Sequence, residues 1–218
     1  MSALEQAREN MLERQIRTWD VLDERVLAAM AAIPRERFVP EGWEALAYAD
    51  MAIPLPHGQA MMEPKVEARL LQAAMVRPSD RILEIGTGSG YMTALLARLG
   101  GSVTSVERIE AFIPTAEEKL QAQGLGNVHL VTGNGRDWLK GPERFDVVVV
   151  TGSVPDASLL SGAVLEEDGR LVAVVGRGPV MEAMLFTREG PVGLCQESLF
   201  DTWVAPLQDI EARPAFQF

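Results

Sequence analysis

The chain has 218 residues, of which 47% are hydrophobic and 23% charged, a composition typical of a globular protein with a sizeable core. Its net charge of -11 repels nucleic acid and anionic membrane surfaces, so we expect neither as a partner. The single cysteine, Cys195, excludes an intrachain disulfide, and the two histidines lie too far apart in sequence to suggest a metal site.

The N-terminal third predicts helices followed by an ordered loop layer. Residues 3–17 and 23–32 place apolar side chains at helical spacing, without a continuous apolar stretch. We therefore expect neither a signal peptide nor a membrane span, and we expect a cytoplasmic protein. Residues 34–64 contain five prolines among large apolar side chains, which predicts a packed loop layer, either functional or a structural wrap around the sheet edge. Residues 64–75 predict a third helix.

Residues 81–107 predict a strand, a glycine turn, a helix and a second strand. The turn carries Gly86, Gly88 and Gly90, which let the chain bend sharply and let a ligand approach the backbone. The second strand ends in Glu107, where a carboxylate accepts hydrogen bonds from a ribose diol in dinucleotide folds. This combination predicts a nucleoside-binding βαβ unit; the alternative is a tight turn with an incidental acid.

The glycine spacing is G-x-G-x-G and differs from the G-x-G-x-x-G that binds a pyrophosphate. A ligand with a ribose but no phosphate fits this spacing better. Glu84, just before the turn, suits a ligand that also carries an ammonium group. S-adenosylmethionine has both features.

The remaining elements predict the rest of an α/β sheet. Residues 110–123 predict a helix, and residues 128–131 a strand that runs into a turn at 133–135. Residues 145–150 form the most β-prone run and predict the central strand, followed by Thr151. The later segments are expected to be a helix at 155–165, a turn at 168–169, a strand at 170–175, and an antiparallel pair at 181–188 and 193–204 around a turn at 189–191. We expect Cys195, within the last strand, to be buried.

Four motifs, taken in order along the chain, resemble the protein-L-isoaspartate O-methyltransferase family. They are PRERFVP at 34–40, YAD at 48–50, PLP at 54–56 and EIGTGSGY at 84–91. The likeness spans nearly the full chain. It implies an α/β, class I methyltransferase (Rossmann-like) fold, with a mostly parallel seven-stranded sheet, helices on both faces and an N-terminal helical layer. It implies one domain over residues 1–218, with the helical and loop layer in 1–76 and the cofactor-binding sheet in 77–218.

The resemblance also implies S-adenosyl-L-methionine as cofactor and no metal. Gly86 to Ser89 would surround its methionine portion, Glu107 its ribose hydroxyls and Asn134 with Gly135 its adenine, while Thr151 would lie near the sulfonium. The full candidate cofactor set is Glu84, Gly86, Thr87, Gly88, Ser89, Gly90, Glu107, Asn134, Gly135 and Thr151. Asn134 stands where the family usually has aspartate, and its side-chain oxygen can still accept from an adenine amino group.

The substrate loop departs from the family pattern. The family usually shows Pro-Leu-Pro-Ile-Gly-x-Gly-Gln-Thr-Ile-Ser-Gln-Pro, whereas residues 54–64 read PLPHGQAMMEP, two residues shorter and without the two hydroxyls. The family serine position is Met62, so no catalytic residue is assigned. The candidate substrate residues are His57, Gly58, Gln59, Ala60, Met61 and Met62. Arg35 or Arg37 could also meet a substrate carboxylate, the alternative being a surface or packing role.

These features leave three functions open. The first is a carboxyl O-methyltransferase that acts on isoaspartyl peptides in protein repair, because an ionised carboxylate with a pKa of about 4 needs no general base. The second is a methyltransferase of the same fold that acts on a more apolar small-molecule acid. The third is a cofactor-binding protein without transferase activity. We expect a monomer or a weak homodimer.

Overall fold

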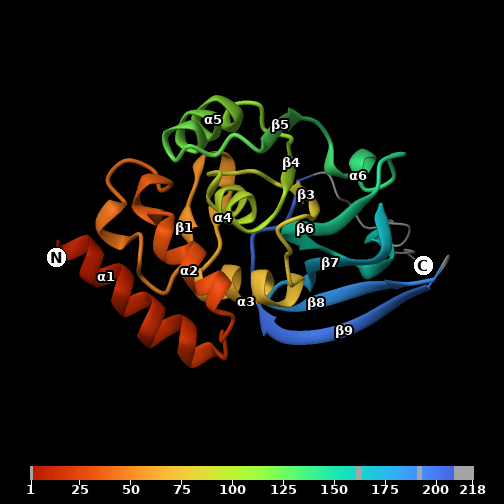
Figure 1. Ribbon diagram of the computed structural model, residues 1–218, viewed down its shortest axis with the longest axis horizontal. Helices are drawn as coiled ribbons and strands as arrows, with labels where there is room; N and C mark the ends of the chain where they lie inside the picture. The colour runs from red at the N-terminus through yellow and green to blue at the C-terminus, as the bar shows by residue number, and fades with distance from the viewer. Residues whose placement is uncertain (1, 161–163, 191–192, 209–218) are drawn as a thin grey trace, which may run out of the picture.

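The structure, a computed structural model, describes residues 2–160, 164–190 and 193–208. Figure 1 shows a central sheet with the N-terminal helices on one side of the view and the long β8–β9 pair on the other. The helices of the described residues are α1 (Ala3–Met11), α2 (Glu24–Ala32), α3 (Pro64–Ala74), α4 (Tyr91–Leu99), α5 (Phe112–Ala122) and α6 (Gly135–Trp138). The strands are β1 (Ile53–Pro54), β2 (Ala60–Met61), β3 (Arg81–Ile85), β4 (Ser102–Glu107), β5 (Val128–Thr132), β6 (Phe145–Val154), β7 (Leu165–Arg177), β8 (Val180–Glu189) and β9 (Gly193–Thr202).

Seven strands form one sheet in the order β5-β4-β3-β6-β7-β8-β9. Strands β3 to β7 pair in parallel, and β8 is antiparallel to both β7 and β9. The predicted mostly parallel seven-stranded sheet is therefore confirmed, with β6 at its centre as expected. The chain runs outward from β3 to β4 on one side and crosses to β6 on the other, so the strand order reverses between β3 and β6. Open α/β sheets bind ligands at the carboxyl ends of the strands beside such a reversal.

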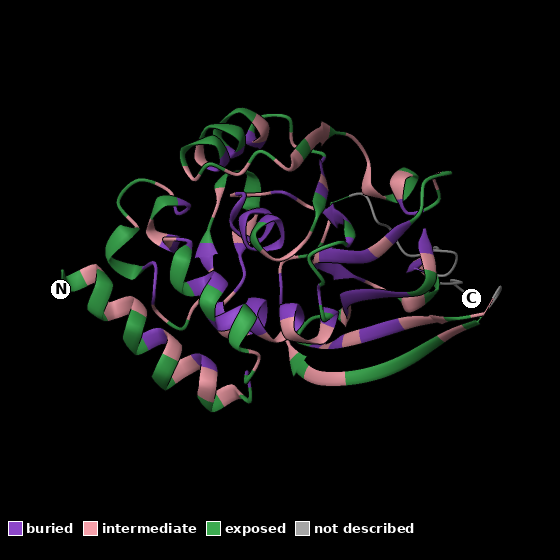
Figure 2. Cartoon of the chain, in the orientation of Figure 1, coloured by how far each residue is buried: buried purple, intermediate pink, exposed green. Residues whose placement is uncertain are grey.

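The sheet separates two hydrophobic cores, because successive strand side chains point to opposite faces. Ile82 and Val147 join the core that contains the buried faces of α2, α3 and α4. Their neighbours Leu83 and Val148 join a second core with Leu139, which directly follows α6. The central strands and α4 are mostly buried in Figure 2, whereas α1, α5 and β9 are largely exposed. Central strands covered on both faces explain the continuous apolar runs in the sequence.

The N-terminal layer is packed as the sequence predicts. Asp23 caps α2 by accepting from the amide of Arg25 (2.9 Å), which is why that helix begins where it does. The predicted first helix continues beyond α1 as a π-helical segment, Leu12–Ile16, and a 3-10 turn. The proline-rich segment forms short 3-10 turns and a small hairpin of β1 and β2, and its Phe38 and Tyr48 are buried.

Two local predictions are wrong, and a third is not fully tested. Instead of a helix over 155–165, the structure has a 3-10 turn, Ala157–Leu160, and Leu165 already pairs with Phe145 of β6; residues 161–163 lie outside the described residues. The turn at Asp168 is a bulge inside β7, because pairing with β6 resumes at Arg170 and outweighs the local turn preference. The hairpin turn at 189–191 lies partly outside the described residues.

The prediction that Cys195 is buried is also wrong. Cys195 is exposed because β9 is the edge strand of the sheet, and most of its side chains face solvent. Among the described residues, no helix is both long and apolar enough to cross a membrane.

Candidate active site

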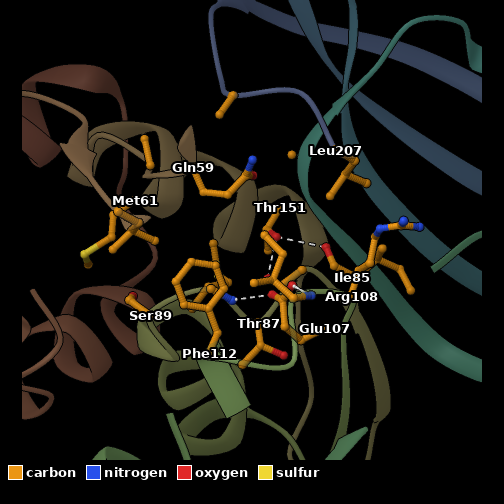
Figure 3. Close-up of a pocket in the computed structure, with 18 of the residues that line it drawn as sticks. Gln59, Met61, Ile85, Thr87, Ser89, Glu107, Arg108, Phe112, Thr151 and Leu207 are labelled. Atoms are coloured by element: carbon orange, nitrogen blue, oxygen red, sulfur yellow. Dashed lines mark hydrogen bonds between the residues drawn. The ribbon is translucent and has the colours of Figure 1, made fainter. Parts of the chain in front are cut away.

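A hollow opens at the carboxyl ends of β3, β4 and β6, where the strand order reverses. One side, here called the strand-end half, is lined by Ile85, Gly86, Thr87, Gly88, Ser89, Met92, Val106, Glu107, Arg108, Ile109, Phe112, Gly135, Thr151 and Gly152. The other, the loop half, is lined by Leu55, Gln59, Ala60, Met61, Met62, Glu67, Ala205, Leu207 and Gln208. Figure 3 shows side chains of both halves turned toward the hollow.

The glycine turn after β3 forms the floor of the strand-end half. Gly86 has a φ of +99°, and a Cβ built on it would lie 2.3 Å from Oγ1 of Thr151. The Thr151 hydroxyl lies 2.6 Å from the carbonyl oxygen of Gly86 and 2.9 Å from that of Ile85. The dashed line to Ile85 in Figure 3 marks the second contact. Only glycine fits at position 86. The two contacts of Thr151 hold the turn against β6.

Glu107 ties the end of β4 to this turn. Its carboxylate accepts hydrogen bonds from the amides of Gly88 (2.9 Å) and Ile109 (2.7 Å), and its side chain is buried while lining the hollow. A carboxylate offers about four lone-pair sites. Two sites are thus left to accept from a ribose diol, the role that the sequence predicts.

Glu84 does not line the hollow. It lies fully buried behind the glycine turn, where one carboxylate oxygen accepts from the hydroxyls of Thr93 (2.5 Å) and Ser105 (2.6 Å). Its other oxygen has no hydrogen-bond partner among the described residues. Burial raises the pKa of Glu84 to about 8. The side chain predicted to face an ammonium group therefore supports the turn from below.

Of the two residues predicted beside the adenine, Gly135 lines the hollow and Asn134 does not. The Asn134 side-chain oxygen accepts from the amide of Arg136 (2.9 Å) as the N-cap of α6, so Asn134 is outside the lining, whereas Gly135 is part of it. A Cβ on Gly135 would lie 2.2 Å from Cγ2 of Ile85. The backbone at Gly135 thus lies against the β3 end with no space for a side chain.

The β1–β2 hairpin carries the predicted substrate residues. Gln59, Ala60, Met61 and Met62 line the loop half, with Met61 and Met62 buried. His57 lies outside this hollow, with its ring edge-on to Phe112 (5.7 Å between centroids), and borders a neighbouring depression. Gly58 lines neither hollow. The backbone amide of Gln59 donates to the carbonyl of Pro56 (3.3 Å), so of this residue the side chain is left to face the hollow.

Residues 205–208 line the loop half on the side away from the hairpin, although the sequence there carries no motif. The segment is held against the end of β6, where the amide of Ser153 donates to Ala205 (3.0 Å) and that of Leu207 donates to Ser153 (3.0 Å). The Gln208 side chain reaches the carbonyl of His57 (3.3 Å). Segments about 150 positions apart in the chain thereby meet across the loop half.

Arg35 is buried beneath the loop half and is not exposed to a substrate. It forms an ion pair with Glu67, also buried, and donates to the carbonyl of Met62 (2.7 Å). Arg37 is exposed. Of the two roles considered for Arg35, the structure gives the packing role. Glu67, which the sequence did not single out, lines the hollow.

The structure thus brings most predicted residues together. Gly86, Thr87, Gly88, Ser89, Glu107, Gly135, Thr151 and the residues 59–62 share one hollow, while Glu84, Gly90, Asn134, His57 and Gly58 lie outside its lining. The missed residues include Phe112 and Ile109, whose signal is their position just after Glu107. Leu207 and Glu67 gave no signal, because only the folded chain brings them to the site.

The strand-end half fits a nucleoside cofactor. It combines two glycines without space for a Cβ, a carboxylate with lone pairs to spare and the apolar side chains of Ile109 and Phe112. These are the contacts that a sugar diol beside a flat base requires. S-adenosyl-L-methionine is a ligand of this kind.

The sequence profile of the family described as "Protein-L-isoaspartate(D-aspartate) O-methyltransferase" matches residues 6–211. The protein-L-isoaspartate O-methyltransferase of Koribacter versatilis is 40% identical over 205 residues, which cover 94% of this chain and 91% of the relative. That of Methanoculleus marisnigri is 41% identical over 186 residues, which cover 85% and 84%.

Two solved structures share the fold. One, a protein-L-isoaspartate O-methyltransferase, has a TM-score of 0.79 at 24% identity and covers 93% of this chain, which spans 66% of that longer one. The other, from Plasmodium falciparum and in complex with S-adenosyl-L-homocysteine, has a TM-score of 0.75 at 19% identity and covers 95% and 99%. With a family profile matched over nearly its whole length, this chain belongs to the protein-L-isoaspartate(D-aspartate) O-methyltransferase family.

Proposed function

We propose that the protein is an S-adenosyl-L-methionine-dependent carboxyl O-methyltransferase that methylates isoaspartyl residues in protein repair. The observation that carries the proposal is the single hollow in which the glycine turn and Glu107 face the substrate loop, in a chain of this family. When bound, the cofactor supplies an electrophilic methyl group on a sulfonium. Every other contribution comes from the chain itself.

The residues of the hollow act by positioning. Glu107 and the backbone at Gly86 and Gly135 hold the nucleoside, and Thr151 fixes the turn beside the methyl donor. Positioning of this kind contributes about 7–11 kcal/mol to a displacement reaction when the geometry is ideal. The acceptor carboxylate is ionised at neutral pH, so no proton needs to be removed.

The loop half receives the acceptor. Its side chains are apolar or uncharged apart from Glu67, and the side-chain amides of Gln59 and Gln208 are its neutral hydrogen-bond donors among the described lining residues. A net charge of -11 makes long-range attraction of an anionic peptide weak. Recognition therefore depends on these local contacts.

The test is methyl transfer from radiolabelled S-adenosylmethionine to an isoaspartyl peptide beside its normal aspartyl twin. Cofactor binding is measured by calorimetry in the same preparation. We expect transfer to the isoaspartyl peptide only. Tight cofactor binding without transfer to either peptide contradicts the proposal.

A second candidate is a methyltransferase of the same fold that acts on a more apolar small-molecule acid. It is favoured by Met61 and Met62, which line the loop half and are only 4% and 7% exposed. At the position of Met62 the family pattern has a serine. Methionine adapts to irregular apolar ligands. Transfer to medium-chain carboxylic acids at a rate above that for the isoaspartyl peptide would favour this candidate.

The proposal includes the setting of the enzyme. We place it in the cytoplasm as a monomer or a weak homodimer, and the lone cysteine supports a compartment where disulfides are not needed. We also propose that residues 1–76 and 77–218 fold as one domain. The core shared by α2, α3 and the sheet supports this.

A further inference from the structure

The floor of the loop half contains a buried ion pair whose role the proposed function leaves open. Arg35 has no exposed surface and Glu67 is 2% exposed, yet Glu67 lines the hollow. Among the lining residues described for the loop half, Glu67 is the only one with an ionisable side chain. An anionic acceptor bound in this half therefore lies near one buried carboxylate.

Arg35 joins three parts of the site. One guanidinium nitrogen binds the carboxylate of Glu67 on α3, and another donates to the carbonyl of Met62 (2.7 Å). Met62 directly precedes Glu63, the N-cap residue of α3. The guanidinium also lies over the ring of Tyr91 (4.7 Å), at the start of α4. The backbone of the substrate loop is thus fixed to the helix that follows it and to the helix behind the glycine turn.

Stability alone does not explain such an arrangement. Burying two charges costs several kcal/mol per ion, and their attraction only roughly offsets this cost. The Nε of Arg35 is also buried without a hydrogen-bond partner among the described residues, which adds a penalty. This pair lies beside the hollow and is bonded to the substrate loop at Met62, so its position points to a local task.

We propose that Arg35 and Glu67 form a charge-compensated clamp that positions the substrate loop and sets the charge an anionic acceptor meets in the loop half. Arg35 is a positioning residue, and Glu67 determines acceptor affinity. The inference rests on the proposed function, since it concerns the carboxylate acceptor of the same site.

The charge state of the clamp changes near neutral pH. Burial raises the pKa of Glu67 to about 7, against the opposing effect of Arg35. The charge of Glu67 in turn raises the pKa of two buried groups, Glu84 on β3 and Tyr91 on α4. Below pH 7 the protonated Glu67 leaves the charge of Arg35 uncompensated, which attracts a carboxylate. Above pH 7 the pair is neutral.

The molecule offers a matched control. Arg170 is also a buried arginine that binds one carboxylate, Asp80 (2.6 Å), and donates to backbone carbonyls, those of Ala74 and Met75 (3.0 Å each). Neither Arg170 nor Asp80 lines the hollow. A variant of Arg170 therefore shows the general effect of losing a buried arginine, and a variant of Arg35 shows in addition any effect specific to the hollow.

The charge role is tested with Glu67→Gln, which keeps the size of the side chain and an acceptor for Arg35. The wild-type KM for the isoaspartyl peptide should rise as the pH increases from 6 to 8. Glu67→Gln should remove this rise and lower KM at pH 8 by about fivefold, with kcat and the cofactor Kd unchanged. Equal KM values for variant and wild type at both pH values overturn the charge role.

The positioning role is tested without activity, by hydrogen exchange of the amides of residues 59–63. Arg35→Lys keeps the charge but cannot reach both partners, so these amides should exchange at least about tenfold faster, whereas Arg170→Lys should leave them unchanged. Equal exchange in both variants overturns the clamp. If the wild type binds cofactor but methylates no isoaspartyl peptide, the proposed function fails, and the exchange measurement still decides the clamp.

Discussion

The two halves of the hollow are built in different ways. The strand-end half consists largely of backbone at the ends of adjacent parallel strands, and its key contacts join residues close to the glycine turn, such as Gly88 and Glu107. The loop half is assembled from the β1–β2 hairpin, α3 and the segment Ala205 to Gln208, which are distant in sequence. The half proposed to hold the cofactor is thus built from the ends of neighbouring strands, whereas the half proposed to hold the acceptor depends on packing between distant segments.

The largest expected effect comes from adding one methyl group to the strand-end half. Gly86→Ala places a Cβ 2.3 Å from Oγ1 of Thr151 at a φ of +99°. We expect the free energy of unfolding to fall by about 2–4 kcal/mol, because overpacking and backbone strain add. Denaturant unfolding measures the change in stability, and calorimetry with S-adenosylmethionine measures the change in cofactor binding. Gly126→Ala is the control, because nothing lies within 4 Å of a Cβ at that position. An equal loss of stability in the two variants would show that the contact with Thr151 does not cause it.

Glu107→Ala removes the carboxylate that links the strand-end half together. The amides of Gly88 and Ile109 lose their acceptor, and each hydrogen bond to a charged group contributes about 1.5–3 kcal/mol. We expect the cofactor Kd to rise about 100-fold, measured by calorimetry. Glu110→Ala, exposed three positions later, should bind normally. An unchanged Kd in Glu107→Ala would show that the turn holds the cofactor without this carboxylate.

Changes to the loop half should affect the acceptor and spare the cofactor. Ala60→Thr with Met62→Ser restores the hydroxyls that the family pattern carries, and each new hydrogen bond contributes about 1 kcal/mol. We expect kcat/KM for the isoaspartyl peptide to rise about tenfold while the cofactor Kd stays constant. No gain from the double change would sink the idea that the missing hydroxyls limit activity.

The last effect appears only when the pH is changed, and it concerns Glu84, which supports the strand-end half from behind. Its pKa rises from 4.5 to about 8 on folding, so between these values the folded state holds a proton that the unfolded state releases. Its contribution to stability is complete below pH 4.5 and is lost as the pH rises through 8, at up to about 1.4 kcal/mol per pH unit. Glu84→Gln should flatten this decline.

Urea unfolding at pH 5, 6.5 and 8 measures the pH dependence, with the exposed Glu117→Gln as control. Glu67, with a pKa raised to about 7, adds a decline of the same sign that both variants retain. Parallel pH profiles for wild type and Glu84→Gln would show that Glu84 is ionised in the folded state.

The sequence by itself determined the elements whose causes are local. The apolar runs of β3 and β6, the glycine turn and the acid at the end of β4 each follow from side-chain period and backbone freedom in the segment itself. Asp23 and Pro64 likewise place the starts of α2 and α3.

Only the tertiary structure decided the rest. Pairing with β6 turned Leu165 from an expected helix into a strand, and the edge position of β9 exposed Cys195. Leu207 reaches the hollow through its bond to Ser153, and Arg35 meets Glu67 across 32 positions. Such contacts form between segments that carry no local signal of each other, because the free energy that holds them comes from burial and pairing in the completed fold.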